Sequence, residues 1–111
     1  MDTVDQLTIA TSLGPDRARV FLRGELDLAT APLLHKHIDA LRAGNGQHRA
    51  LVLLDLAEVT FCDSSGLRAL LEILDRCHRV GTNLRLTNVP PSVHRLFQLT
   101  GTTSVLNIDT K

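Results

Sequence analysis

The sequence predicts a single small α/β domain in which helices pack on a mixed β-sheet. Three observations carry this prediction. Apolar runs of strand length recur along the chain, segments with apolar residues at helical spacing separate the later runs, and glycine- or proline-containing turns divide them. The expected order is β-β-α-β-α-β-α-β, with the strands that helices separate lying parallel. A length of 111 residues leaves room for one core, so residues 1–111 are expected to form one domain.

The first half of the chain is expected to form a hairpin followed by a helix. Residues 7–10 alternate apolar with small residues, and residues 17–24 contain Val20, Phe21 and Leu22 between arginines, so both segments are expected to be strands. The turn sequence Gly-Pro-Asp lies between them. Thr30 is expected to cap a helix whose first turn contains Pro32, where a missing N–H does little harm. Apolar residues at helical spacing continue to the glycines of residues 44–46, which are expected to end the helix.

The second half is expected to alternate strands and helices. Residues 51–54 are continuously apolar, as expected of a central strand covered on both faces. A helix is expected from near Ser64 to Gly81, and shorter elements follow at 84–86 (strand), 91–100 (helix) and 105–108 (strand). The expected buried face of the helix from Ser64 consists of Leu67, Leu70, Leu71, Leu74 and Cys77.

Composition excludes several classes of function. Twelve Lys and Arg balance twelve Asp and Glu, so the chain lacks the basic excess of a nucleic-acid-binding protein or of one docking on anionic lipid. The sequence contains no apolar run of the roughly 20 residues that span a bilayer. Its first ten residues include two aspartates and lack the basic and apolar regions of a signal peptide, so a cytoplasmic location without membrane insertion is expected. Two cysteines are too few for a disulfide scaffold.

Functional residues are expected at the carboxyl ends of the parallel strands. Three loops fit that description, at residues 24–27, 61–66 and 88–91, and they are expected to share one end of the domain. The middle loop, Asp63-Ser64-Ser65-Gly66, is the most informative. Asp63 or Ser64 can cap the following helix. Gly66 costs up to about 1 kcal/mol relative to alanine in a first helical turn, which indicates that something comes close to the backbone there.

Signatures of enzymes and of cofactor sites are missing. Ser64 and Gly66 have the spacing of a nucleophile elbow, but Cys62 replaces the first glycine of that motif. Neither glycine-rich phosphate-binding pattern occurs, so no nucleotide cofactor is expected. His35 and His37 lie on different faces of their helix, which predicts solvated side chains and not a pair of metal ligands. The sequence therefore predicts no catalytic residue, no metal and no cofactor.

Several motifs together resemble one family. The sequence Gly24-Glu25-Leu26-Asp27 follows the second strand, the segment 55–67 contains Asp63-Ser64-Ser65-Gly66-Leu67, and the segment 91–101 contains Arg95-Leu96-Phe97. In this order they resemble the STAS domain of bacterial anti-sigma factor antagonists, over residues 7–108. Arg68, where a small residue often stands, and Cys62, where a plain apolar residue is usual, depart from the family pattern.

The resemblance implies a regulatory binding protein that is not an enzyme. In this family the unphosphorylated antagonist binds an anti-sigma factor and so releases the sigma factor. The anti-sigma factor is also a serine kinase, which inactivates the antagonist by phosphorylating the serine that corresponds to Ser64, and a serine phosphatase reverses the modification. The positions implied to bind the partner are Asp27, Asp63, Ser65, Gly66 and Leu67.

Two alternatives remain open at this stage. STAS domains also occur as subunits of membrane transport machinery, including lipid transporters, and those can keep a similar loop. The remaining alternative is an enzyme, which would be indicated by turnover of an ester or nucleotide that Ser64→Ala abolishes.

Overall fold

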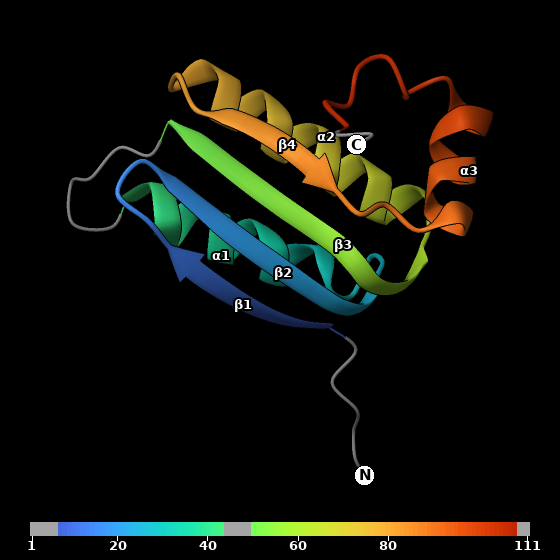
Figure 1. Cartoon of the computed structure of the whole chain (residues 1–111). Coiled ribbons are helices and arrows are strands. Elements are labelled where there is room, and N and C mark those ends of the chain that lie inside the picture. The colour runs from blue at the N-terminus through green and yellow to red at the C-terminus, as the bar shows by residue number, and fades with distance from the viewer. Residues whose placement is uncertain (1–6, 44–49, 109–111) are drawn as a thin grey trace, which may run out of the picture.

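A four-stranded sheet in the order β1-β2-β3-β4 is the frame of the molecule (Figure 1). The structure is a computed structural model and describes residues 7–43 and 50–108. Strand β1 pairs antiparallel with β2, while β2 with β3 and β3 with β4 pair in parallel. The single α/β domain with a mixed sheet is thereby confirmed. Its elements are β1 (Leu7–Leu13), β2 (Arg17–Leu26), α1 (Ala31–Ala43), β3 (Leu51–Cys62), α2 (Ser64–Arg79), β4 (Asn83–Thr87) and α3 (Pro91–Thr100).

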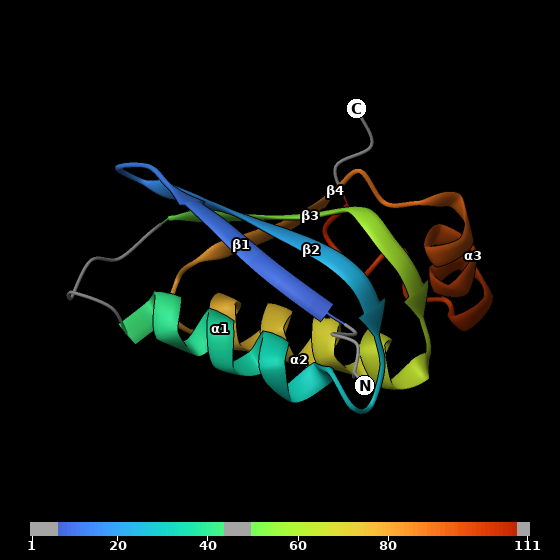
Figure 2. The same cartoon turned by 90° about the horizontal axis from the view of Figure 1, so that it is seen from below.

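Helices α1 and α2 lie side by side on one face of the sheet, and α3 lies at its end (Figure 2). The alternation in β2 explains which face they cover. Val20 and Leu22 are buried toward the helices, while Arg19, Phe21 and Arg23 point to the opposite face and are exposed. A strand buries every second side chain when one face of its sheet is covered. The core therefore lies between the sheet and the two helices.

Strand β3 differs from the prediction in length and in what covers it. It runs to Cys62, well past the apolar run at residues 51–54, and pairs with β2 through two register shifts along the way. Such shifts break the alternation that marks a strand in a sequence. Helices cover only one of its faces, yet Leu53 is only 7% exposed on the other. Its neighbours there are Arg19 and Arg85, and side chains of this kind cover apolar surface with their methylene groups.

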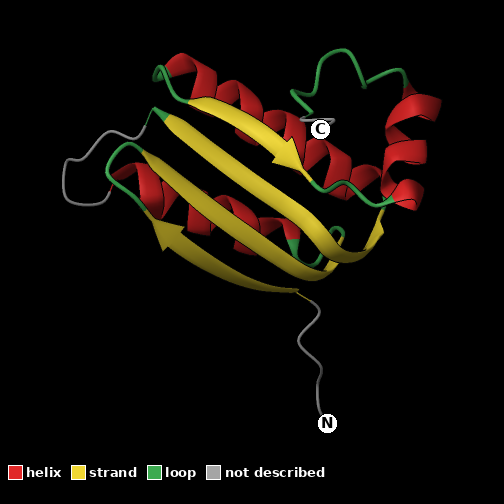
Figure 3. Ribbon diagram, in the orientation of Figure 1, coloured by secondary structure: helices red, strands yellow, loops and turns green. Residues whose placement is uncertain are grey.

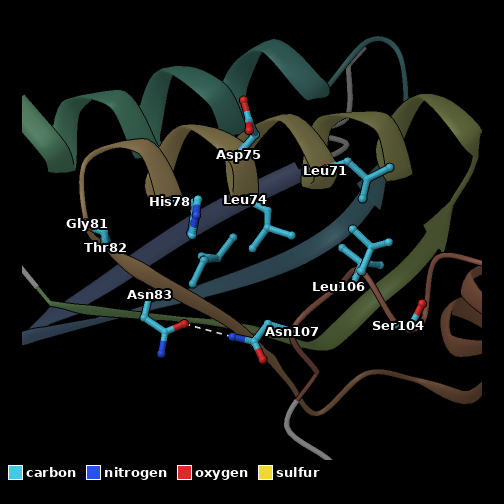
Figure 4. A pocket seen from close by; sticks show the side chains of 12 residues that line it. Leu71, Leu74, Asp75, His78, Gly81, Thr82, Asn83, Ser104, Leu106 and Asn107 are labelled. Carbon is cyan, nitrogen blue, oxygen red and sulfur yellow. Dashed lines mark hydrogen bonds between the residues drawn. The ribbon is translucent and has the colours of Figure 1, made fainter.

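The buried face of α2 was predicted only in part. Leu67, Leu70 and Cys77 are buried as expected, and the other buried residues of the helix are Gly66, Ala69 and Ile73. Leu71 and Leu74 are only half-buried and line a cavity of about 650 Å³ between α2, β4 and residues 104–107 (Figure 4). Both leucines lie at the margin of the helix face that packs on the sheet. Helical spacing shows that such a face exists, but it does not show which residues lie at its middle.

The predicted last strand at residues 105–108 is not formed. Ile108 makes one isolated parallel bridge to Leu86, and the residues before it form turns (Figure 3). The backbone N–H groups of Val105 and Leu106 both donate to the Thr102 carbonyl, at 3.0 and 2.9 Å. Because a turn takes up these donors, the segment cannot extend along β4 as a ladder.

Helices α1 and α2 are joined by an ion pair and by a histidine–carboxylate contact, neither of which the sequence predicted. Arg76 of α2 donates from Nη1 to Asp39 Oδ2 of α1 at 3.0 Å. His35 Nε2 lies 3.0 Å from Glu72 Oε1, and the His35 side chain is 19% exposed. The prediction of a solvated histidine is therefore wrong for His35. The charged face of α2 contacts the neighbouring helix, which pattern analysis of a single helix cannot reveal.

His37 ties α1 to strand β1. Its Nε2 shares a hydrogen bond with the Thr11 hydroxyl, and burial lowers the pKa of its imidazole. This histidine is also less solvated than predicted. None of the helices in the described ranges is long and apolar enough to cross a membrane.

We expect His37 to make the protein less stable in mild acid. Its pKa is lowered in the folded state, so below the ordinary value of 6.5 the unfolded chain takes up a proton that the folded chain refuses. Stability is therefore complete above that value and falls as the pH drops toward the lowered folded-state pKa. Urea unfolding at about pH 7.5 and 5.5 should show a smaller loss for His37→Gln than for the natural chain. The exposed His78→Gln serves as control, and an unchanged loss in His37→Gln would contradict the assignment.

Candidate functional site

Two of the three predicted loops meet at the carboxyl ends of β2 and β3. The register pairs Leu26 with Cys62, so the two strands end level with each other. The backbone N–H of Asp63 then donates to the Leu26 carbonyl at 3.3 Å. The third loop lies further back along β3, where β4 ends opposite Asp55 and the Asn88 amide donates to the Asp55 carboxylate at 3.0 Å. The sequence predicted that the three loops share one end of the domain, and the first two of them are in direct contact there.

Asp63 is the N-cap of α2. Its backbone is extended, with φ −106° and ψ −169°, and its Oδ1 accepts a hydrogen bond from the Gly66 N–H at 3.0 Å. Ser64 follows as the first residue of the helix and is exposed. Within the described part of the chain, neither its hydroxyl nor that of Ser65 makes a hydrogen bond. The open question of which residue caps the helix is therefore decided for Asp63, and the Ser64 hydroxyl is left available to solvent.

Gly66 is where the two loops are in closest contact. A Cβ placed on it would lie 2.3 Å from the Leu26 carbonyl oxygen and 3.0 Å from Cys62 Sγ. The close backbone approach predicted from this glycine is confirmed, and the approaching group is the end of β2 itself. Leu67 is buried in the core beneath the loop. Gly66 and Leu67 are both buried under the loop and stabilise its position. That they contact a partner directly stays a prediction.

Asp27 holds the other loop in shape. Its Oδ1 accepts hydrogen bonds from the N–H groups of Ala29 and Thr30 at 3.0 and 3.1 Å. The Thr30 hydroxyl accepts from the Asp27 N–H and donates to the Glu25 carbonyl, both at 2.9 Å. Thr30 stands directly before α1 as predicted, but its side chain turns back into the loop and does not cap the helix. The half-buried carboxylate of Asp27 is consequently fixed beside the start of α2.

Three large apolar side chains at or close in sequence to these loops are exposed, and the sequence did not predict their exposure. Leu28 is 75% exposed, Leu33 in the first turn of α1 is 50% exposed, and Phe61 near the end of β3 is 49% exposed. We call Leu28, Leu33 and Phe61 the apolar rim. Exposed large apolar side chains are typical of protein interaction sites. The sequence did contain a signal for Leu28. It directly follows the predicted loop Gly-Glu-Leu-Asp, and loop residues usually lie on the surface, so its exposure could have been predicted.

Cys62 is chemically quiet despite its place beside Ser64. Burial, and secondarily the Asp63 carboxylate, raise the pKa of its thiol to about 12. The thiolate is the reactive form of cysteine, and it is almost absent at neutral pH with such a pKa. Cys62 therefore packs against Gly66 as a small core side chain.

The loops and their spacing correspond to a known family. The family model described as "STAS domain" matches residues 13–111. The chain belongs to the STAS domain family. An anti-sigma-B factor antagonist from Staphylococcus epidermidis is 31% identical over 103 residues, which cover 93% of this chain and 93% of that relative. Relatives of this kind support a regulatory binding protein as the coarse function of the chain.

Solved structures show the same fold. An anti-sigma factor antagonist from Mycobacterium paratuberculosis superimposes with a TM-score of 0.82 at 24% identity, covering 100% of this chain and 92% of that one. The Bacillus protein SpoIIAA in its phosphorylated form gives 0.67 at 20% identity, covering 94% and 93%. A sulfate transporter family protein from Wolinella succinogenes gives 0.71 at 17% identity, covering 87% and 79%. The fold alone thus occurs in both settings that the sequence left open.

The contact at Gly66 leads to a stability prediction. Gly66→Ala should lower the free energy of unfolding by about 1–3 kcal/mol, because the added methyl group overlaps a backbone carbonyl that cannot move freely. Urea unfolding followed by circular dichroism measures this loss. Ser65→Ala, one residue earlier, is the matched control and should stay within about 0.5 kcal/mol of the natural chain. Equal stability of the two variants would contradict the prediction, because it would show that the backbone of β2 at Leu26 moves to make room for the added methyl group.

The division of roles between Asp63 and Ser64 leads to another prediction. Asp63→Ala should cost about 1 kcal/mol of stability, because the Gly66 N–H loses its acceptor. Ser64→Ala should cost nothing measurable, because its hydroxyl bonds no described residue and alanine has the higher helix propensity. Thermal unfolding of the two variants beside the natural chain decides the matter. A loss in Ser64→Ala as large as that in Asp63→Ala would make Ser64 the cap.

Proposed function

We propose that this chain is an anti-sigma factor antagonist that phosphorylation of Ser64 switches off. In its unphosphorylated form it binds an anti-sigma factor that is also a serine kinase, and a serine phosphatase restores this form. The observation that carries the proposal is the exposed hydroxyl of Ser64 at the first position of a 16-residue helix whose cap is supplied by Asp63. A serine kept only for capping would have its hydroxyl engaged in the first turn.

The partner surface consists of the two joined loops and the apolar rim. Asp27, Asp63 and Ser65 are half-buried and Ser64 is exposed, while Leu28 in the first loop and Phe61 near the end of β3 are exposed apolar residues. Such a surface combines apolar area with a few fixed polar groups, as non-obligate protein interfaces do. It fits a partner that covers the leucine and phenylalanine side chains and places hydrogen-bonding groups against the serine hydroxyls.

Phosphorylation is expected to act on the interface and to leave the fold intact. A phosphate on Ser64 adds about −1.5 to −2 charge, and the positive end of the helix dipole favours it by about 0.3–1 kcal/mol. Asp63 is the adjacent residue and Asp27 belongs to the contacting loop, so the surface becomes strongly anionic. A partner fitted to neutral hydroxyls then meets like charge and a desolvation cost. About 2.7 kcal/mol is enough to weaken binding a hundredfold.

The remaining parts of the proposal follow from this role. The whole chain, residues 1–111, acts as one STAS domain in the cytoplasm, and it binds its partners without catalysing a reaction. The transporter alternative shares the fold but gives Ser64 no task as a phosphate acceptor. The free hydroxyl of Ser64 and the anti-sigma factor antagonists among the relatives favour the switch.

The switch is tested with Ser64→Ala and Ser64→Asp as baits in a native lysate, read by mass spectrometry. The alanine variant should retain a kinase-like anti-sigma factor, while the aspartate variant should lose it by about a hundredfold in affinity. Ser12→Asp is the matched control, because Ser12 is an exposed serine that pairs with Arg19, well away from the end of β2 at Leu26. This control should bind like the natural chain.

Two results would contradict the proposal. Recovery of the same transporter subunits by both baits would assign the chain to a transport complex. Turnover of an ester or nucleotide that Ser64→Ala abolishes would make the protein an enzyme.

A further inference from the structure

Strand β1 forms one edge of the sheet and is open along its length (Figure 1). It pairs with β2 on one side, and within residues 7–43 and 50–108 nothing pairs with its other side. The opposite edge is different. Beside β4, the Leu86 N–H donates to the Asn107 carbonyl at 2.8 Å, and the Asn107 amide donates to Asn83 Oδ1 at 2.9 Å. The C-terminal segment therefore covers part of the β4 edge, whereas no other described segment pairs with the outer edge of β1.

The β1 edge carries none of the usual protection against pairing. Its seven residues, Leu-Thr-Ile-Ala-Thr-Ser-Leu, include no charged residue and no proline. Each of the other strands has at least one charged side chain. Natural proteins place lysine, proline or a bulge on exposed edges because a bare edge is a template for another strand. An uncharged edge of this length indicates a strand that pairs.

The sequence of β1 is nearly symmetric about Ala10. Leu7 and Leu13 stand at equal distances from it, as do Thr8 and Ser12. The same holds for Ile9 and Thr11, which are both β-branched. In an antiparallel pair of two such strands, leucine therefore meets leucine, threonine meets serine, and Ile9 meets the equally β-branched Thr11. No other partner strand is needed to explain this pattern.

We propose that β1 pairs antiparallel with β1 of a second copy of this chain, about a two-fold axis at Ala10. The four-stranded sheets of the two copies then join into one continuous sheet. On the helix-covered face, Leu7 lies opposite Leu13 of the second copy. On the open face, Thr8 lies opposite Ser12 of the second copy, within reach of a hydrogen bond between hydroxyls.

Burial along β1 fits this arrangement. Leu13 is 57% exposed in the single chain, and the paired Leu7 side chain would cover part of it. Thr8, Ala10 and Ser12 are exposed and small, so two edges can approach to the usual strand spacing of about 4.8 Å. The arginines of β2 sit one strand away from the joint, opposite Thr8 and Ser12 on their own chain. No like charges are therefore brought together across the new ladder.

Introduced charges test the pairing without disturbing the single chain. In Thr8→Glu/Ser12→Glu, each new carboxylate lies opposite an arginine of its own β2, Arg23 or Arg19, which keeps the monomer folded. Across the axis, however, the new carboxylates face each other. Sedimentation velocity over a concentration series should show a dimer for the natural chain and self-association weaker by about tenfold or more for this variant.

A charge-swapped variant supplies the decisive comparison. In Thr8→Glu/Ser12→Lys the carboxylate of one copy faces the ammonium of the other, so the dimer should return. Ser92→Glu/Gln98→Glu adds the same two charges at exposed positions of α3, which lies on the other side of the sheet from β1 (Figure 1), and should dimerise like the natural chain. The proposal is overturned if the natural chain stays monomeric at high concentration. It is equally overturned if the Glu/Glu and Glu/Lys variants associate to the same extent.

A cross-link locates the axis. Residues directly opposite each other in an antiparallel pair have Cα atoms about 4.5–5.5 Å apart, which lies within the range of a disulfide. Under mild oxidation Ala10→Cys should therefore give a covalent dimer, and Thr60→Cys should not. Cys77 is buried and the pKa of Cys62 is about 12, so the native thiols do not compete. A dimer that fails to cross-link through Ala10→Cys would place the interface elsewhere. Ser64→Asp should leave all of these results unchanged, which separates them from the switch.

Discussion

The contact between the end of β2 and the start of α2 determines the geometry of the candidate site. The Leu26 carbonyl accepts the Asp63 N–H, and Gly66 sits so close to the same carbonyl that a Cβ would lie 2.3 Å from it. This contact requires β2 and β3 to end level, which the two register shifts between them bring about. Because the loop and the helix start are fixed against one strand end, Ser64 has one orientation relative to Asp27 and to the apolar rim.

The carboxylates of this site have structural tasks that leave the serine free. Asp63 caps α2 and Asp27 accepts the N–H groups of Ala29 and Thr30, so both negative charges are held by backbone donors. Fixed charges beside a free hydroxyl make a surface that tolerates a neutral serine and opposes a partner once that serine is charged. A switch of this kind requires no conformational change, because the difference lies in the electrostatics of the interface.

The fold class, the loop and the close approach at Gly66 could be predicted because each is specified locally. A cap, a free serine and a glycine at fixed spacing constrain the backbone whatever packs around them. The remaining features depend on neighbours that lie far away in the sequence. Register shifts extended β3 beyond its apolar run, and the Thr102 carbonyl took the donors of the expected last strand.

Neighbours that lie far away in the sequence also determine the burial of the residues that were predicted incorrectly or not at all. His35 is removed from solvent by Glu72, which lies on another helix. Leu71 and Leu74 have the helical spacing of core residues, but the direction of the sheet places them at the edge of the stripe. The exposure of Leu28 and Phe61 depends on where the two loops point. Tertiary contacts of this kind change which residues are buried, although the sequence pattern itself stays the same.

The two proposed surfaces are compatible because of strand direction. Strand β1 runs antiparallel to β2, and the Ser64 loop lies at the carboxyl ends of β2 and β3. A two-fold axis through Ala10 reverses every strand of the second copy, so its Ser64 loop points in the opposite direction from the first. The two loops then lie at opposite ends of the joined sheet, each with its own apolar rim exposed. Pairing through β1 therefore leaves both partner surfaces open, and a phosphate on either Ser64 is remote from the edge that joins the copies. Two such chains would present two independent switches on one scaffold.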